Sequence, residues 1–150
     1  MGRNQLLCIE TVLKIAMEAG NCLAEHWGGV LALLSKLDYL YNIRSTKMEH
    51  SPLLLRQAEF LFPHLEHAQI DKIFNSSVRL DAEAILQFIV QLIALSDQEL
   101  SAERPRLFAV QRLVEMTDLN MHRIKIIWSR IWTLIKEHFN KVPSRTHTHF

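Results

Sequence analysis

Residues 105–142, PRLFAVQRLVEMTDLNMHRIKIIWSRIWTLIKEHFNKV, decide the fold of this chain. Apolar side chains recur every three or four residues over 106–116 and again over 121–139, which predicts two amphipathic α-helices. In the later helix, steps of about 100° per residue place Trp128 and Trp132 within one apolar arc. Such a face has to be covered, so we expect both indoles to pack in the core.

Charged residues border the apolar arc of this last helix. Arg123 and Arg130 flank one side of the arc, whereas Lys125 and Lys136 flank the other. Ile126 is the one apolar side chain that falls in the polar arc. Exposed cations attract acidic surfaces over a distance, and an isolated outward apolar side chain can contact a partner. These five positions are therefore the candidate interaction residues.

Polar residues are placed to begin several helices. Asp81 stands at the N-cap position of a helix over 82–95, where its carboxylate would accept a hydrogen bond from a free backbone N–H. Asn120 stands at the same position before the last long helix. Residues 96–99, SDQE, match a capping box for a brief turn between the helix over 82–95 and its successor.

Similar apolar patterns extend to the start of the chain, with Trp27 in the stripe of the second helix. The predicted upstream helices cover residues 4–19, 22–41, 52–62, 65–75 and 82–95, and residues 42–51 form an exposed loop. Pairs of about 35–45 residues joined by short turns lie within the range of HEAT and armadillo units. We therefore predict an all-α fold, a HEAT/armadillo-like α-solenoid fragment of antiparallel helix pairs over residues 1–142. Residues 143–150 are predicted to form a disordered or unrelated tail.

Composition restricts the fold class and the setting. The chain is 49% hydrophobic with four Gly and four Pro, too few chain breakers for an all-β sandwich. Polar residues interrupt every apolar run before it could span a membrane. Glu10 and Lys14 suit an amphipathic helix rather than a secretory signal. Cys8 and Cys22 lie in helical apolar patterns without a CxxC, which predicts two buried thiols in a reducing compartment; a disulfide between adjacent helices is the alternative.

The net charge of +1 conceals an uneven distribution along the chain. Residues 104–150 contain nine Lys or Arg and three acidic residues, a balance of +6. Residues 1–103 contain eight Lys or Arg and thirteen acidic residues, a balance of −5. Such polarity favours either a basic end that faces an acidic partner surface or salt-bridge packing between neighbouring helix pairs. The sequence alone leaves both readings open.

Familiar catalytic motifs are not found in the sequence. It contains no GxxxxGK[ST] loop, no GxGxxG and no GxSxG elbow, so we predict neither enzyme activity nor a bound cofactor. His64, Glu66 and His67 are the best candidates for metal ligands. Zinc normally needs three or four convergent ligands, however, and no second pair stands at matching spacing. We therefore expect no metal site.

Nucleic-acid binding is the other reading of the basic end. Arg106, Arg112 and the basic residues near Trp128 and Trp132 would suit it if the aromatic rings shared the basic face, where bases could stack on them. Both indoles fall in the apolar arc instead, and no groove-reading motif is present. A nucleic-acid partner is not predicted.

Three segments of the chain together resemble a known family. Residues 10–40, ETVLKIAMEAGNCLAEHWGGVLALLSKLDYL, contain a GN-L---W core, and residues 74–85 read FNSSVRLDAEAI. Residues 120–132 contain N-M-x-R-I followed by W-S-R-I-W. This combination resembles the helical region downstream of the catalytic domain in large, brefeldin A-inhibited Arf guanine-nucleotide exchange factors. The catalytic segment of that family has no counterpart in this sequence.

The resemblance implies a non-catalytic regulatory or scaffolding segment that contributes to membrane recruitment, autoinhibition or binding of an activated Arf-family GTPase in Golgi vesicle trafficking. The implied partners are an Arf-family small GTPase, other domains of the parent exchange factor and an anionic membrane surface. The implied location is cytoplasmic, peripheral to Golgi and trans-Golgi membranes. The alternative is a generic helical-repeat adaptor that binds a peptide helix in a groove.

Overall fold

The computed structural model describes residues 2–45, 52–61, 63, 65–121 and 128–147, and within these residues it contains α- and 3₁₀-helices and no strand. The α-helices are α1 (Arg3–Glu18), α2 (Trp27–Ser45), α3 (Pro52–Leu61), α4 (Ala68–Asn75), α5 (Ala82–Ser101), α6 (Phe108–Asn120) and α7 (Trp128–His147). The predicted all-α class is thereby confirmed. No helix in the described part of the chain is long and apolar enough to cross a bilayer.

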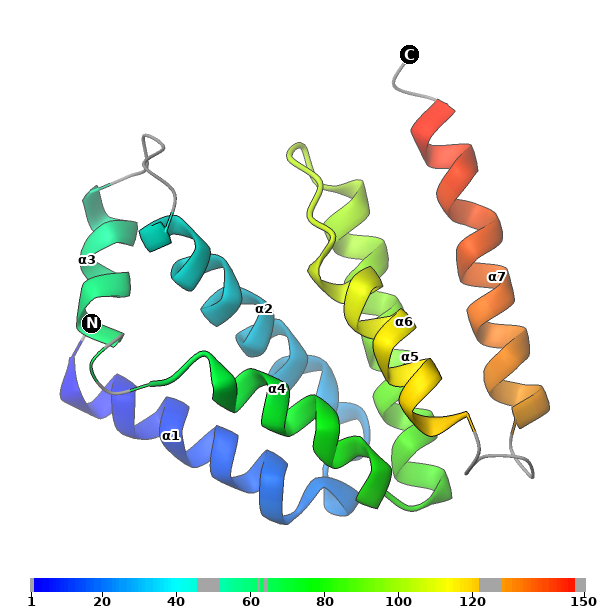
Figure 1. Ribbon diagram of the computed structural model, residues 1–150, viewed down its shortest axis with the longest axis horizontal. Helices are drawn as coiled ribbons and strands as arrows, with labels where there is room; N and C mark the ends of the chain where they lie inside the picture. The colour runs from blue at the N-terminus through cyan, green and yellow to red at the C-terminus, as the bar shows by residue number, and fades with distance from the viewer. Residues whose placement is uncertain (1, 46–51, 62, 64, 122–127, 148–150) are drawn as a thin grey trace.

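The helices form two rows that lie side by side (Figure 1). Helix α4 contacts both α1 and α6 in one row, whereas α5 contacts both α2 and α7 in the other. Helix α5 also packs along α6, and α3 packs on α2. Helix α5 thus lies at the centre of the fold, and α7 ends its row.

Aromatic side chains connect the two rows through α5. The Phe88 ring is buried, with its centroid 4.7 Å from that of Trp27 and 5.8 Å from that of Phe74. The Phe74 ring is in turn 5.9 Å from Phe108 at the start of α6. All three pairs are edge-to-face, a favourable geometry for aromatic quadrupoles. Helix α5 therefore lies at the centre of this aromatic core.

The GN-L---W core is a junction between α1, α2 and α5. The buried indole of Trp27 donates from Nε1 to the carbonyl of Gly20 at 3.1 Å. The Asn21 side chain accepts from the backbone N–H of Asp81 at 2.9 Å, and the Asp81 carboxylate accepts from the N–H of Ala84 at 2.8 Å. The predicted N-cap role of Asp81 is confirmed. The hydrogen bond between Asn21 and Asp81 therefore joins the GN-L---W core to the N-terminus of α5, 60 residues later in the chain.

Several predicted helix boundaries are wrong. The second helix starts at Trp27 rather than at residue 22, because Ala24 has φ 46° and so interrupts the helical path. That helix continues to Ser45, into the predicted loop 42–51, whose residues 46–51 lie outside the described part. Residues 96–99 do not form a separate capped turn, because they continue α5.

The predicted ends of the last two helices also change. Helix α6 spans Phe108–Asn120 rather than 106–116, so Asn120 is its last residue instead of a cap for the next helix. Asn120 is buried and donates from Nδ2 to Ser77 Oγ and to the Met116 carbonyl, both at 2.9 Å. Helix α7 continues beyond the predicted end at Phe139 to His147.

The prediction of buried thiols is also wrong. Cys8 and Cys22 are both exposed and free. Helix α1 buries Leu6, Leu13 and Ala16, and this face does not include Cys8. An apolar pattern shows that a helix is amphipathic, but a small apolar residue at its edge can remain in solvent.

The Gly20 junction leads to a stability prediction with an internal control. A Cβ at Gly20 would lie 2.7 Å from Leu80 Cδ2 and 3.0 Å from Trp27 Cζ2, whereas a Cβ at Gly29 meets nothing within 4 Å. Gly20→Ala should lower the free energy of unfolding by about 1–3 kcal/mol through overpacking. Gly29→Ala should raise it by up to about 1 kcal/mol, because Gly is a poor helix former. Urea denaturation measures both changes, and equal effects of the two substitutions would contradict this account of the junction.

Candidate interaction surfaces

The predicted interaction residues on α7 divide into two groups. Arg130 and Lys136 are exposed on this helix. Arg123, Lys125 and Ile126 lie outside the described residues, so their assignment stays a prediction. Lys141 is also exposed on α7, whereas Glu137 is an exposed acidic residue between the cations. We call Arg130, Lys136, Glu137 and Lys141 the outer face of α7, and it carries more positive than negative charge.

An apolar groove separates α6 from α7. It has a volume of about 440 Å³, and the side chains of Val114, Met121, Trp132, Ile135 and Phe139 line most of it. Trp132 is 51% exposed, so the expectation of a core indole is wrong for this residue. The side chain of Trp128 lies outside the described part of the structure. Exposed apolar clusters of this kind mark interaction surfaces.

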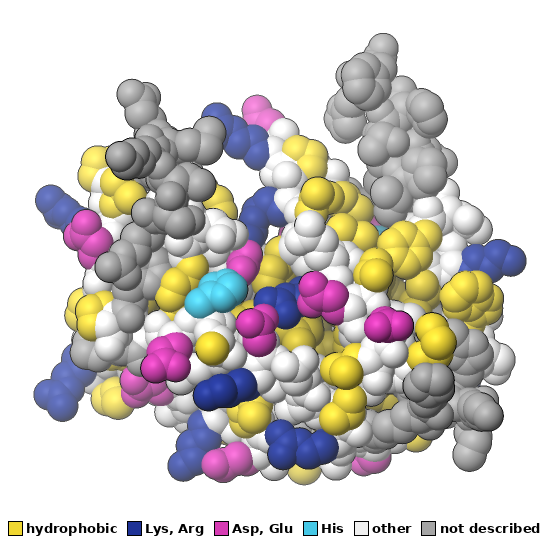
Figure 2. Space-filling model, viewed as in Figure 1, with side chains coloured by type: hydrophobic (Ala, Val, Ile, Leu, Met, Phe, Trp, Pro, Cys, Tyr) yellow, Lys and Arg dark blue, Asp and Glu magenta, His cyan; other side chains and the backbone are white. Residues whose placement is uncertain are grey.

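Two arginines of the basic segment are engaged inside the molecule. Arg112 Nη2 is 2.6 Å from the Asp71 carboxylate of α4, and the guanidinium lies over the Phe74 ring at 4.8 Å. Arg106 lies over the Tyr39 ring at 4.9 Å. Figure 2 shows basic and acidic side chains interleaved on the face it presents. Arg106 Nη2 is also 3.8 Å from the Asp38 carboxylate of α2, so both arginines form salt bridges with acidic residues of earlier helices, as the second reading of the charge distribution predicted.

A buried polar cluster fixes the turn between α5 and α6 against α2. The Glu99 carboxylate accepts from the Ser35 hydroxyl and from the backbone N–H of Ala109, the latter at 2.9 Å. Arg106 donates to Ser35 Oγ at 2.9 Å and to the Ser35 carbonyl at 3.1 Å. The two donors satisfy the hydrogen-bonding capacity of the buried Glu99 carboxylate, whose burial without partners would be costly.

The candidate metal ligands are not brought together among the described residues. His67 Nε2 lies 2.9 Å from the Asp38 carboxylate, and its ring packs edge-on against Tyr41. His64 lies outside the described residues. Within the described residues, no group of three or more His, Cys, Asp or Glu is arranged so that it could hold a metal ion. His67 instead links the α3–α4 connection to α2.

A serine, a histidine and an aspartate meet between α5 and α7. His138 Nε2 is 2.8 Å from Ser96 Oγ, and His138 Nδ1 is 3.4 Å from Asp97 Oδ1. Sequence spacing gave no sign of this contact, since 42 residues separate Ser96 from His138. Both side chains are buried, with Ser96 0% and His138 2% exposed. A nucleophile has to reach its substrate, so burial favours a structural role in joining α7 to α5.

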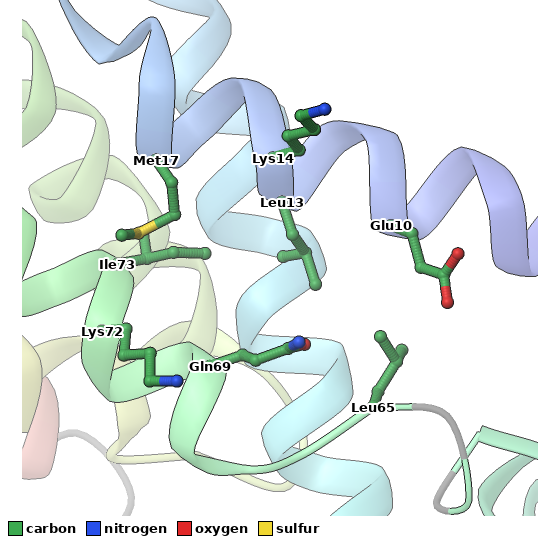
Figure 3. Close-up of a pocket in the computed structure, with 8 residues that line it drawn as sticks. All are labelled: Glu10, Leu13, Lys14, Met17, Leu65, Gln69, Lys72 and Ile73. Atoms are coloured by element: carbon green, nitrogen blue, oxygen red, sulfur yellow. The ribbon is translucent and has the colours of Figure 1, made fainter.

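Sequence reasoning also missed a pocket between α1 and α4 (Figure 3). Its volume is about 280 Å³. Eight side chains line it, namely Glu10, Leu13, Lys14, Met17, Leu65, Gln69, Lys72 and Ile73. The short helix α4 carries a strongly one-sided apolar pattern, but no local signal shows which of its polar residues face α1.

The family comparisons agree with the motifs. No protein-family model matches the chain. The human "Brefeldin A-inhibited guanine nucleotide-exchange protein 1" is 50% identical over 74 residues, which make up 49% of this chain and 4% of that protein. The "ADP-ribosylation factor guanine nucleotide-exchange factor sec72" of Schizosaccharomyces pombe is 28% identical over a match that covers 98% of this chain and 10% of that protein. An Arabidopsis thaliana protein with the same name as the human one is 25% identical, covering 95% of this chain and 12% of that protein.

The chain is thus homologous to one region of the guanine-nucleotide exchange factors for ADP-ribosylation factors, the Arf GTPases. Within that class, its relatives include the large brefeldin A-inhibited exchange proteins, as the motifs predicted. The chain spans between 4% and 12% of the length of these three relatives.

The Tyr41 environment predicts a change of stability at alkaline pH. Burial, reinforced by the nearby Glu66 carboxylate, raises the pKa of Tyr41 above its ordinary value of 10.0, and its hydroxyl donates to the Leu65 carbonyl. As the pH rises, Tyr41 therefore ionises in the unfolded chain before it ionises in the folded protein. Its contribution to the free energy of unfolding is fully present below pH 10.0 and is lost as the pH rises through the pKa of Tyr41 in the folded protein. Tyr41→Phe should cost about 1 kcal/mol at neutral pH. Urea denaturation measures the difference in the free energy of unfolding between wild type and Tyr41→Phe, and this difference should decrease above pH 10.0. A difference that does not depend on pH would contradict the assignment.

The Ser96–His138 contact predicts a coupling between two substitutions. Ser96→Ala and His138→Leu should each destabilise the fold by about 1–3 kcal/mol, because each removes the hydrogen bond between Ser96 Oγ and His138 Nε2 at a buried site. The double variant should lose less free energy of unfolding than the sum of the losses in the two single variants, since it removes both partners of the hydrogen bond. Urea denaturation of the four proteins gives the coupling energy. Strict additivity would mean that the two side chains do not stabilise one another.

Proposed function

We propose that this chain is a non-catalytic regulatory segment of a large Arf guanine-nucleotide exchange factor. In this proposal it contributes to membrane recruitment, autoinhibition or binding of an activated Arf-family GTPase at trans-Golgi membranes. The observation that carries the proposal is the outer face of α7, where Arg130, Lys136 and Lys141 are exposed and make no ion pair with another described residue. The similarity to exchange factors supports the choice of partner.

The arrangement of the rows supports this use of α7. Helix α7 packs on α5 and lies at the edge of the described fold (Figure 1). Arg106 and Arg112 are held by acidic and aromatic neighbours, whereas Arg130, Lys136 and Lys141 on α7 remain exposed. An exposed cationic face attracts anionic lipid headgroups or an acidic protein surface, and it accelerates encounter at low salt. It supplies no group for exchange chemistry itself.

A second candidate function follows from the groove between α6 and α7. Its apolar lining, with half-exposed Trp132, suits the apolar face of a peptide helix. In that case the chain is a helical-repeat adaptor rather than a charge-guided docking segment. The two functions differ in their dependence on salt, because burial of apolar surface is little weakened by ions that screen exposed charges.

Charge reversal on α7 tests the proposed function. The double variant Arg130→Glu/Lys136→Glu should bind vesicles of phosphatidylserine and phosphatidylcholine carrying GTP-loaded Arf at least about fivefold more weakly than wild type. Each cation near an anionic surface contributes about 1 kcal/mol. Co-sedimentation at low and raised salt measures the change, and wild-type binding should fall as salt rises.

Arg56→Glu is the matched control, because it reverses an exposed charge on α3, far from α7 (Figure 1). It should bind as wild type does. Equal binding by all three proteins would remove the outer face of α7 from the proposal. Binding that ignores salt and is lost in Trp132→Ala would favour the adaptor.

A further inference from the structure

The groove between α6 and α7 carries apolar side chains that the described fold leaves in solvent. Both helices pack on α5, and Val114 and Met121 on the α6 side and Trp132 on the α7 side are each about half-exposed. Figure 2 shows hydrophobic side chains gathered where these two helices lie side by side. Monomeric proteins rarely leave large apolar side chains clustered in solvent, so we expect a partner surface to cover them.

The positions along the groove follow from the directions of the two helices. Helices α6 and α7 run in opposite directions (Figure 1). Met121 and Trp132 lie next to the connection between them, at one end of the groove, and Val114 and Phe139 lie towards the other end. On each helix seven residues separate the two ends, a rise of about 10 Å. Asp118 and Lys136 therefore face one another across the middle of the groove.

These two charged residues give the walls of the groove opposite signs. Asp118 on the α6 wall and Lys136 on the α7 wall are both exposed. Neither side chain forms an ion pair with another described residue. An apolar floor between an acidic and a basic wall fits a partner that presents the same features with the charges in the opposite order.

A second copy of this chain presents that order of charges. A twofold axis parallel to the groove places α7 of each copy over α6 of the other, so that each Lys136 meets the Asp118 of the other copy. The same rotation brings Trp132 over Met121 of the other copy, and Val114 over Phe139. A twofold axis across the groove would bring like charges together instead. The charges therefore select one of the two symmetric arrangements.

We infer that the chain forms a symmetric dimer through the groove between α6 and α7. The interface has two ion pairs between Asp118 and Lys136 and two contacts between an indole and the thioether of Met121, a favourable sulfur–aromatic pair. Arg130 and Lys141 do not line the groove, so the inference goes beyond the binding proposed for the outer face of α7 and does not depend on it. The peptide-helix adaptor would place a different protein in the same groove.

Sedimentation equilibrium of the 150-residue chain tests the dimer. Concentrations from about 10 µM to about 1 mM cover the weak affinities of small interfaces, and wild type should dimerise reversibly in this range. Trp132→Ala should raise the dissociation constant at least about tenfold, because the interface contains two copies of this ring. Leu53→Ala is the matched control, since it shortens a 63% exposed apolar side chain on α3. It should dimerise as wild type does.

Charge reversal tests how the two copies are arranged. Asp118→Lys and Lys136→Glu should each weaken dimerisation about tenfold, because each replaces two attractive pairs by two repulsive ones. An equimolar mixture of these two variants should form a heterodimer about as tightly as wild type dimerises, because a lysine again faces an acidic residue at both positions. Circular dichroism shows whether each variant keeps its helices.

Three outcomes would overturn the inference. Wild type would remain monomeric at the highest concentration, Trp132→Ala would dimerise as tightly as wild type, or the mixture of charge variants would form no dimer. A monomeric wild type would leave the groove to a different protein, as in the adaptor function. No vesicle or GTPase enters these measurements, so the dimer and the function proposed for the outer face of α7 fail separately.

Discussion

The close packing of Trp27 against Gly20 is the contact on which the rest of this fold depends. The indole is fully buried, its N–H is bonded to the Gly20 carbonyl, and its ring meets Phe88 of α5. A single side chain thus fixes the end of α1, the start of α2 and the centre of α5. Burial of an aromatic ring contributes several kcal/mol, and the bonded N–H removes the penalty for its polar end. Because α5 contacts α2, α6 and α7, its position determines where the remaining helices lie.

Polar contacts in the core fix the relative positions of the helices more closely than apolar packing alone does. Glu99 holds the first turn of α6 and a hydroxyl of α2, and Ser96 meets His138 of α7. Each contact joins helices that apolar packing alone would let slide, because hydrogen bonds require a defined geometry. Burying these groups costs free energy unless all are paired, so their pairing favours one arrangement of α2, α5, α6 and α7 over near alternatives. The surfaces of α7 and of the α1–α4 pocket therefore rest on a defined framework.

The success of sequence reasoning depended on the range of the interactions. The fold class, the N-cap at Asp81 and the burial of Trp27 follow from local patterns, and all three were correct. Asn120 was misassigned because its partner, Ser77, lies 43 residues away. Trp132 was expected in the core because periodicity shows which residues share a face, but not whether another helix covers it. Periodicity placed Arg130 and Lys136 outside the apolar arc of α7, where the structure finds them exposed, whereas Lys141, Gln69 and the α1–α4 pocket were not predicted.

Contacts within the fold pair some basic residues of the carboxyl-terminal part with acidic residues earlier in the chain. Arg112 and Arg106 return to acidic residues of the earlier segment, where short range and aromatic neighbours make the pairing effective. Exposed cations remain on α7, and others, such as Arg56 on α3, lie elsewhere on the described surface. The exposed cations of α7 lie on an open face, whereas the pocket between α1 and α4 is lined by side chains of both helices. An open face attracts a broad anionic surface, whereas an enclosed pocket discriminates by shape.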